Sequence, residues 1–416
     1  MYFRGPIIAI IATDFIHHIL ISTIEMEIVC FSHLRWDFVF QRPQHLLTRL
    51  AEQFRIFYVE EPLHHSSHDH YTQAIHDNIH TIKLHLSGGP EESGITLRLQ
   101  ALVNKIFDHH KINEYILWYY TPMAIPMSDE LRPVLTIYDC MDELSAFRFA
   151  PPALKKLEKE LLNRADVVFT GGNSLYEAKK HQHHNIHAFP SSIDKKHFGK
   201  ARHIKNDPAD QAAIAHPRFG FYGVIDERFD IDLIREVAEK RPDWNFVLIG
   251  PVVKIDPRIL PKNKNIHYLG SKHYDELPSY LAGWDISLVS FALNESTTYI
   301  SPTKTPEYLA GGKPVISTPI KDVVNTYGKQ GLVHIVDNAA TFIDTASTEL
   351  ATVNKKKWLS KVDKFLANDS WDITVKNMRI LIYEALAAKQ IFEEQQNMEK
   401  FSAHYLGRNP SLPAAS

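Results

Sequence analysis

The stretch SPTKTPEYLAGGKPVIST (301–318) is the part of the sequence that indicates the fold most clearly. Proline suits the first turn of a helix, where its missing N–H costs nothing, so Pro302 and Pro306 predict a helix start. The Gly-Gly pair at 311–312 can end that helix in a left-handed conformation. The apolar run at 315–316 then predicts a buried strand. The stretch is therefore interpreted as a helix that leads directly into a strand.

The same helix carries groups that suit a nucleotide. A helix N-terminus concentrates unpaired N–H groups and partial positive charge, so it can hold a phosphate. We expect Thr303, Lys304 and Thr305 at that end, where the lysine adds a full charge. Glu307 follows one turn later as an acceptor for sugar hydroxyls, with Tyr308 beside it as a further donor-site residue. The stretch thus predicts donors for a diphosphate and an acceptor for a ribose.

This pattern resembles the nucleotide-sugar motif of retaining glycosyltransferases of the GT-B fold, in the large family 4 group. In that family, the Glu at the place of Glu307 holds the ribose, and a Gly-x-Pro-Val run follows. Many members carry a second Glu eight residues earlier, where this chain has Tyr299. The stretch RWDFVFQRPQHLL (35–47) also resembles the opening of a bacterial subgroup that includes teichuronic-acid-type glycosyltransferases. The resemblance implies an α/β protein with two Rossmann-like, doubly wound parallel-sheet domains facing a cleft.

Composition sets limits on the class of protein. A length of 416 residues predicts two or three domains, and a net charge of −3 gives no electrostatic case for nucleic acid. Cys30 and Cys140 lie in or beside apolar strand-like runs, so we expect buried thiols in a reducing compartment. The first 25 residues are apolar but interrupted by Asp14, His17 and His18. We expect an upstream extension with Met26 as the natural start; a membrane-associated segment is the alternative.

The order of the predicted elements indicates how the chain is divided. A strand, a loop, a helix and a second strand over 27–59 are typical of a parallel sheet. The histidine-rich segment HHSSHDHY (64–71) fits no familiar zinc-ligand spacing, and we expect a solvated loop there. We expect an N-terminal extension (1–25), an acceptor-side domain (26–200), a linker (201–216), a nucleotide-sugar-binding domain (217–370), a helix crossing back to the first domain (371–406) and a disordered tail (407–416).

Polar groups after the predicted strands of the first domain indicate an acceptor side. In a parallel sheet, ligands gather outside the carboxyl ends of the strands. Asp139 and Asp142 follow such a strand, and we expect them to hold sugar hydroxyls or the attacking acceptor; helix capping by Asp142 is the alternative. Relatives place a His-Asp doublet where this chain has Tyr138 and Asp139.

The loop after the first strand faces the cleft in GT-B enzymes. We expect His33, Arg35 and Arg42 to touch the acceptor or the donor phosphate. The open alternative is that they cap the following helix and line a solvated surface.

The second domain supplies the remaining predicted donor contacts. Arg228 lies where relatives carry a Lys or Arg on the donor diphosphate; a surface ion pair with Asp226, Glu227 or Asp230 is the alternative. Many relatives also have an Arg directly after the glycine, where this chain has Val224. We expect the backbone at Gly223, Gly250 and Pro251 to approach the phosphates or the base closely.

These expectations combine into one function. We expect transfer of a hexose-type sugar from a UDP- or GDP-linked donor to a hydroxyl of a glycan or lipid-linked saccharide of the cell envelope. Arg228, Lys304 and the helix N-terminus would stabilise the departing phosphate, so we expect no metal and no cofactor. The resemblance implies retention of configuration. We expect a cytoplasmic location with weak association at the inner face of the membrane. A sugar-nucleotide epimerase and a non-catalytic sugar-nucleotide or glycan-binding protein are the rival interpretations.

Overall fold

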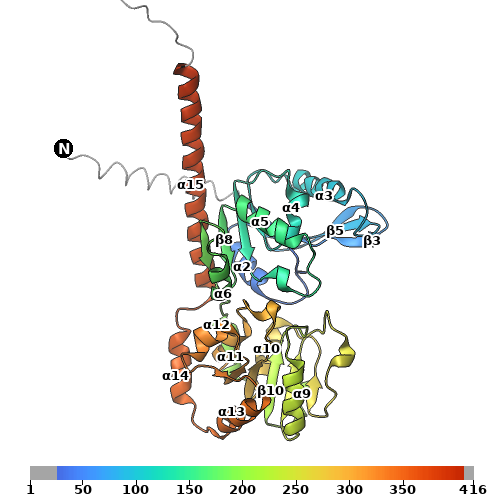
Figure 1. The fold of residues 1–416 in the computed structure, drawn as a ribbon, viewed down its shortest axis with the longest axis vertical. Helices are drawn as coiled ribbons and strands as arrows, with labels where there is room; N and C mark the ends of the chain where they lie inside the picture. The colour runs from blue at the N-terminus through green and yellow to red at the C-terminus, as the bar shows by residue number, and fades with distance from the viewer. Residues whose placement is uncertain (1–25, 407–416) are drawn as a thin grey trace, which may run out of the picture.

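The computed structural model describes residues 26–406 and shows two α/β domains, one above the other (Figure 1). Helix α15 (Trp371–Leu406) follows the second domain and runs along the side of the first. The predicted extension at 1–25 and the predicted tail at 407–416 lie outside the described residues.

The first domain is built on a nine-stranded sheet with the order β3-β5-β2-β1-β6-β7-β8-β9, in which β4 pairs with β5. Its neighbouring strands are parallel except for the β4–β5 pair. Strands that follow β1 are added to one edge of the sheet up to β5 and to the other edge from β6 onward. The position between β1 and β6 is therefore the topological switch point, where open α/β sheets bind ligands. Its strands are β1 (Glu27–Ser32), β2 (Arg55–Glu60), β3 (Leu63–Ser66), β4 (His70–His76), β5 (Ile79–Ser87), β6 (Tyr115–Tyr119), β7 (Leu135–Cys140), β8 (Val167–Thr170) and β9 (Ile186–Ala188). Its helices are α2 (Arg42–Leu50), α3 (Ile95–His110), α4 (Ile125–Ser128), α5 (Leu154–Arg164) and α6 (Asn173–Lys179).

The second domain has a six-stranded parallel sheet with the order β12-β11-β10-β13-β14-β15. Numbered from its own first strand, this is the 3-2-1-4-5-6 order of the Rossmann fold. Its strands are β10 (Arg218–Tyr222), β11 (Asn245–Ile249), β12 (Ile266–Tyr268), β13 (Ile286–Val289), β14 (Val315–Ser317) and β15 (His334–Ile335). The remaining helices are α7 (Lys195–Gly199), α8 (Ala209–Ala212), α9 (Ile231–Lys240), α10 (Leu277–Ala282), α11 (Lys304–Ala310), α12 (Lys321–Val323), α13 (Ala339–Ala351) and α14 (Lys356–Phe365). Both doubly wound parallel sheets confirm the predicted fold class.

Short helical turns occur in both domains, and two of them approach the site described below. One, η2 (Leu144–Ala146), follows the end of β7, and another, η5 (Tyr274–Glu276), precedes α10. The others are η1 (Pro122–Ala124), η3 (Lys200–Arg202), η4 (Pro257–Ile259), η6 (Glu295–Thr297) and the π-helical turn η7 (Val324–Gly328).

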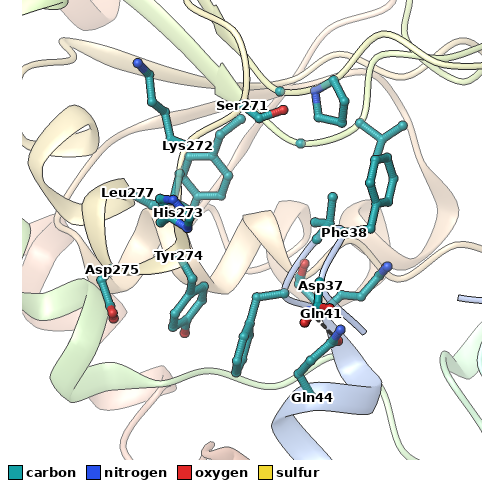
Figure 2. A pocket seen from close by; sticks show the side chains of 18 of the residues that line it. Asp37, Phe38, Gln41, Gln44, Ser271, Lys272, His273, Tyr274, Asp275 and Leu277 are labelled. Atoms are coloured by element: carbon teal, nitrogen blue, oxygen red, sulfur yellow. Dashed lines mark hydrogen bonds between the residues drawn. The ribbon is translucent and has the colours of Figure 1, made fainter. Parts of the chain in front are cut away.

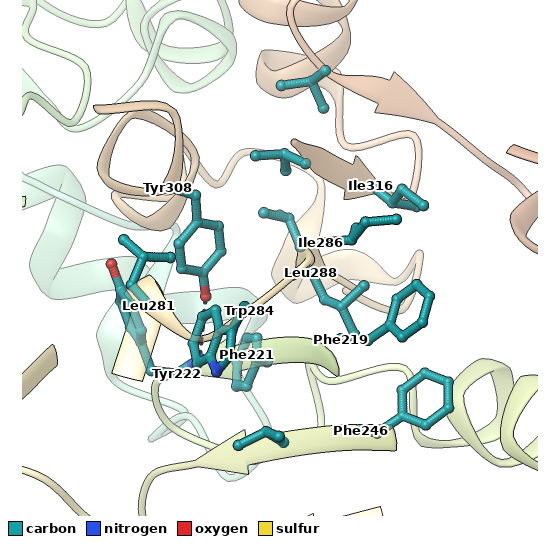
Figure 3. Close-up of a cluster of buried hydrophobic side chains, with 14 of the residues drawn as sticks. Phe219, Phe221, Tyr222, Phe246, Leu281, Trp284, Ile286, Leu288, Tyr308 and Ile316 are labelled. Carbon is teal, nitrogen blue, oxygen red and sulfur yellow. Dashed lines mark hydrogen bonds between the residues drawn. The ribbon is translucent and has the colours of Figure 1, made fainter. Parts of the chain in front are cut away.

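An aromatic core fixes the position of α11 on the second sheet (Figure 3). Trp284 and Tyr308 are fully buried, and their ring centroids lie 5.8 Å apart in an edge-on arrangement. Trp284 also lies so close to the middle of β10 that a Cβ atom on Gly220 would be 1.8 Å from its ring. The packing of these rings therefore holds the whole stretch 304–310 in one place relative to β10.

Helix α15 joins the two domains through its first half. Val375, Met378, Ile382 and Leu386 are buried in the core of the first domain, on the face that the spacing of three and four predicted. The chain therefore leaves the second domain and returns to pack on the first.

The structure corrects the sequence interpretation in two places. Residues 64–71 are not a simple loop, because β3 and β4 occupy most of them. Both strands pair with β5 and are largely exposed, and their histidines give no alternation of apolar and polar residues to recognise. Residues 201–216, expected to be a linker, include α8 and pack on the second domain, since the buried Gln211 accepts a 2.9 Å hydrogen bond from Trp284.

Cys30 and Cys140 are both buried and free, as predicted. In residues 26–406, no helix combines the length and the apolar character needed to cross a bilayer. The same residues contain no cluster of three or more His, Cys, Asp or Glu side chains arranged for a metal ion.

Candidate functional site

A cavity of about 610 Å³ lies between the two domains. The second domain lines it with residues that follow its strands and with α11, and the first domain contributes the loop after β1 and the start of α2. Figure 2 shows Asp37, Phe38, Gln41 and Gln44 on one side and the segment Ser271–Leu277 on the other. Of the residues predicted to bind the donor or act on it, the lining includes Gly223, Arg228, Gly250, Pro251, Thr303, Lys304 and Glu307.

Glu307 presents its carboxylate on the wall of this cavity. The Tyr222 hydroxyl donates a 2.8 Å hydrogen bond to Glu307 Oε2, and Glu307 as a whole is 5% exposed. Burial raises the pKa of Glu307 to about 7, an effect that the Tyr222 hydrogen bond and the charge of Lys304 oppose. The second carboxylate oxygen remains available for a hydroxyl of a ligand.

Lys304 lies one turn before Glu307 and directly above Gly223. A Cβ atom on Gly223 would lie 2.2 Å from Lys304 Cε and 2.7 Å from Nζ, and the positive φ of Gly223 disfavours any other residue. Burial lowers the pKa of Lys304, although the charge of Glu307 favours the protonated form. Within residues 26–406, the Lys304 ammonium has no hydrogen bond or ion pair. It is therefore a fixed donor facing the cavity.

Gly250 packs against Gly223 on the same wall of the cavity. A Cβ atom on Gly250 would lie 1.9 Å from the carbonyl oxygen of Gly223, and Gly250 also has a positive φ. The two loops after β10 and β11 therefore pack backbone to backbone. This close packing brings Pro251 to the cavity wall together with Gly223 and Gly250.

Arg228 forms the ion pair that the sequence left open as its alternative, and it also lines the cavity. Its Nε and Nη2 atoms donate to the buried Asp226 carboxylate at 3.0 and 2.7 Å. Phe147 of the first domain places its ring 5.1 Å from the guanidinium carbon of Arg228. Asp226 and Phe147 thus hold Arg228 in one orientation from opposite domains.

Asp142 stands in the loop after β7. Burial raises its pKa to about 6, and the nearby cations Arg228 and Arg42 oppose that rise. The turn η2, which follows Asp142 in the chain, contacts η6 of the second domain. Asp142 is not among the residues that line the cavity, so its role toward the acceptor stays a prediction.

Arg42 and Asp139 form a buried pair with each other, and neither lines the cavity. Three donor–acceptor distances of 2.8–3.1 Å join the guanidinium to the carboxylate, and Arg42 also donates to the Phe189 carbonyl at 2.7 Å. The sequence had placed both residues at the substrate, so the structure corrects this. Asp139 lies inside β7, not after it, which turns its side chain inward.

The other predicted acceptor-side residues are also outside the cavity lining. Arg35 pairs with the buried Glu60 at 3.1 Å, which fixes the loop after β1. Burial and the charge of Lys254 lower the pKa of His33 to about 4. His33 is therefore neutral at physiological pH.

Tyr308 and Thr305 are core residues of α11, not cavity residues. Tyr308 is fully buried, and its hydroxyl accepts a 3.1 Å hydrogen bond from the Tyr222 amide (Figure 3). The Thr305 side chain is also fully buried, and its hydroxyl has no partner among the described residues. Both were predicted as donor contacts because the helical phase of α11 was not known.

Tyr222 and Phe147 were not predicted as site residues, and Asp226 was considered only as a surface partner of Arg228. The Asp-x-Arg spacing of Asp226 and Arg228 is the one local signal that pointed to their contact. Tyr299, which stands in place of the second Glu of many relatives, packs against the core of the first domain. Its side chain joins the two domains and does not line the cavity.

Residues 216–351 match the family described as "Glycosyl transferases group 1". Among curated proteins, the chain is 25% identical over 222 residues to TuaH of Bacillus subtilis (strain 168), which is assigned to teichuronic acid biosynthesis as a glycosyltransferase. That match covers 49% of this chain and 55% of TuaH, so the matched stretch spans about half the length of that relative.

Solved structures share the fold over most of the chain. Sucrose-phosphate synthase of Thermosynechococcus elongatus has a TM-score of 0.66 and 14% identity, over 88% of this chain and 100% of that one. Anabaena HepE, solved in complex with UDP and glucose, has a TM-score of 0.59 and 14% identity, over 87% and 100%. Residues 216–351 thus resemble group 1 glycosyltransferases in sequence, and the chain has the GT-B fold, as the resemblance implied.

Proposed function

We propose that this protein transfers a hexose-type sugar from a nucleoside diphosphate, UDP or GDP, to a hydroxyl group of a glycan or lipid-linked saccharide. The observation that carries the proposal is the placement of Lys304 and Glu307. They lie one turn apart on α11 and line the same interdomain cavity. A free ammonium beside a carboxylate at that spacing suits a diphosphate and a ribose together.

Lys304 and Arg228 supply the electrostatic part of the mechanism. Breaking the anomeric bond places negative charge on the departing phosphate. Cations fixed before the reaction stabilise this charge without reorganisation, which is commonly the largest single contribution to catalysis. Arg228 is held by Asp226 and Lys304 by its packing over Gly223. With these two cations in place, we propose that the reaction requires neither a metal ion nor a cofactor.

The backbone at the start of α11 adds two further donors. The amides of Thr305 and Glu307 already donate to the carbonyls of Pro302 and Thr303 at 3.2 and 3.3 Å. The amides of Thr303 and Lys304 make no such bond in the described part of the chain. They stand beside the Lys304 side chain and complete an anion site with it.

Asp142 is proposed to orient the acceptor. Its raised pKa, about 6, leaves it ionised at neutral pH but close enough to protonation to accept a proton from a hydroxyl. Glu307 takes the ribose, and the backbone at Gly250 and Pro251 takes the base. Closure of the two domains around these groups would exclude water, which otherwise competes as the acceptor.

The descriptions of two similar proteins support the proposed donor and acceptor. TuaH is assigned to teichuronic acid biosynthesis, which favours a cell-envelope acceptor, and HepE was solved with UDP and glucose. The resemblance to family 4 favours retention of anomeric configuration. We place the protein in the cytoplasm, at the inner face of the membrane, because sugar nucleotides are made there.

A donor screen tests this proposal. The chain is incubated with UDP- and GDP-sugars, with EDTA present, and products are identified by mass spectrometry with simple saccharide and polyprenyl-saccharide acceptors. We expect one donor to give transfer or slow hydrolysis, lost in Lys304→Ala. An epimerised sugar nucleotide without a transfer product, or binding with no turnover of any donor, would contradict the proposal.

A further inference from the structure

Helix α15 has two halves in different surroundings. In the first half, Trp371, Val375, Met378, Ile382 and Leu386 are buried against the first domain. In the second half, every residue from 391 to 400 is exposed. Figure 1 shows this half projecting well beyond the first domain. A helical segment of this length is only marginally stable in water by itself, so a partner for it would add stability.

Four exposed apolar side chains form a stripe along α15 on the side opposite its buried face, with the exposed Glu384 between Ile380 and Ile391 on the same side. Ile373, Ile380, Ile391 and Met398 are between 40% and 65% exposed. They are separated by 7, 11 and 7 positions, close to about two, three and two whole turns. Residues two positions apart differ by about 200° around a helix, so Ile380 points away from the buried Met378 and Ile382. The stripe is about 37 Å long and extends over both halves of the helix.

The spacing of residues along the stripe is the same from either end of the helix. The spacings 7, 11 and 7 are symmetric about a point between residues 385 and 386. A two-fold axis at that point would bring a second copy of α15 alongside in the antiparallel direction. Ile373 would then face Met398 of the second copy, and Ile380 would face Ile391. Such self-complementarity is what an isologous interface requires.

Charges beside the stripe follow the same symmetry. Lys376 and Glu394 are 18 positions apart, about five whole turns, so they flank the stripe on the same side. In an antiparallel pair of helices, residues of the same flank meet, and these two stand at nearly equal distances from the centre. Neither residue forms an ion pair within residues 26–406. Two Lys376–Glu394 pairs would therefore border the stripe.

The charges on the projecting half of α15 do not suit a membrane surface as the binding partner of the stripe. Interfacial helices are rich in Lys and Arg on their polar face. The projecting residues 387–400 instead hold Glu393, Glu394 and Glu399 against two lysines, and one of these, Lys389, is paired with Asp166 at 2.9 Å. We propose that the protein forms a two-fold symmetric dimer in which the exposed stripes of two α15 helices pack antiparallel.

This arrangement leaves both cavities accessible. The buried face of each α15 lies opposite its stripe, so the two protein bodies stand on the outer sides of the helix pair and at opposite ends of it. Each projecting half then covers the packed half of the other copy. The dimer does not depend on the activity proposed above.

Analytical ultracentrifugation of the full chain tests the dimer. We expect the wild-type chain to sediment as a dimer and the double variant Ile380→Glu/Ile391→Glu as a folded monomer, with circular dichroism as the check on folding. Phe392→Glu is the matched control, because Phe392 is 59% exposed but lies about 100° away from the stripe. It should remain dimeric. A monomeric wild-type chain, including one that floats with lipid vesicles, or a dimer that persists in the double variant would overturn the proposal.

Cross-linking tests the antiparallel register. The two native cysteines are buried, so introduced cysteines should be the reactive ones. Ile373→Cys and Met398→Cys together in one chain should give a covalent dimer on mild oxidation, and each alone should not. Lys376→Glu and Glu394→Lys should each weaken the dimer about tenfold, and their combination should restore it. Cross-linking by Ile373→Cys alone would indicate parallel helices and overturn the register.

Discussion

Arg228 and Arg258 make the same contact with an aspartate two residues earlier, but only Arg228 lines the interdomain cavity. Both guanidinium groups donate from Nε to Oδ1 at 3.0 Å and use Nη2 for a second bond to Oδ2. The side chain of Arg258 is 88% exposed, against 24% for Arg228. The same local geometry therefore serves as a surface contact at one position and as a fixed cation at the other.

This pair supplies a matched test of the electrostatic mechanism. Arg228→Ala should lower kcat by about 100-fold or more, because a cation aimed at the departing phosphate acts mainly in the transition state. Nucleotide affinity should fall by less than tenfold. Arg258→Ala should change neither. Steady-state kinetics with the donor found in the screen would measure this, and equal losses in kcat and affinity for Arg228→Ala would indicate a simple ground-state contact.

Tyr222→Phe should make nucleotide binding more dependent on pH. The Tyr222 hydroxyl bond favours the ionised form of Glu307, so its loss raises the pKa of that carboxyl further above about 7. The variant should bind about 5–10-fold more weakly at pH 7 and recover toward wild type at pH 8.5.

Calorimetric titrations across that pH range would measure the effect. Tyr280→Phe is the control, since Tyr280 donates a similar 2.8 Å bond to Asp210 outside the cavity. A loss in Tyr222→Phe that stays constant with pH would show that the hydroxyl acts in another way.

Glu307 should cost the protein stability at neutral and alkaline pH. Its pKa is raised on folding, so between about pH 4.5 and 7 the folded state holds more protons than the unfolded state, and stability falls as pH rises through that window. Glu307→Gln should therefore raise the free energy of unfolding by about 1–3 kcal/mol at pH 8. The gain should vanish near pH 4. Urea denaturation at both pH values would show it, and a gain independent of pH would contradict this assignment.

Removal of Asp139 should destabilise the first domain. It leaves the Arg42 guanidinium buried without its partner, which typically costs about 3–5 kcal/mol. The comparison is Asp372→Ala, which breaks the exposed Arg49–Asp372 pair and should cost at most about 1 kcal/mol. If Asp139→Ala unfolded like the wild-type chain but lost turnover, the sequence-based placement of Asp139 at the substrate would be restored.

The sequence was informative where a pattern repeats or where backbone geometry demands one residue. Alternating strands and helices predicted both sheets, and the α15 spacing predicted its buried face. Gly223 and Gly250 were predicted to approach a ligand, which stays a prediction; the structure shows that both line the cavity and that their loops pack too closely for a side chain. Lys304 and Glu307 were predicted from one short stretch, since one helical turn separates them.

Side-chain direction within an element could not be predicted in the same way. Asp139 was taken to follow β7, but the strand runs two residues further and turns it inward toward Arg42. Tyr308 neighbours Glu307 in sequence but points into the aromatic core. The contact of Phe147 with Arg228 joins two domains, and no local pattern indicates such a pair. The sequence likewise did not indicate that Tyr299 packs against the core of the first domain.

Calorimetric titration with UDP, GDP and ADP tests the central claim most directly, which is that Glu307 and Lys304 hold a nucleoside diphosphate in the interdomain cavity. We expect one of the three to bind the wild-type chain, and Glu307→Ala to weaken its binding at least about tenfold, in line with the loss of a hydrogen bond to a charged group. Absence of binding for all three nucleotides, or an unchanged affinity in Glu307→Ala, would contradict the claim.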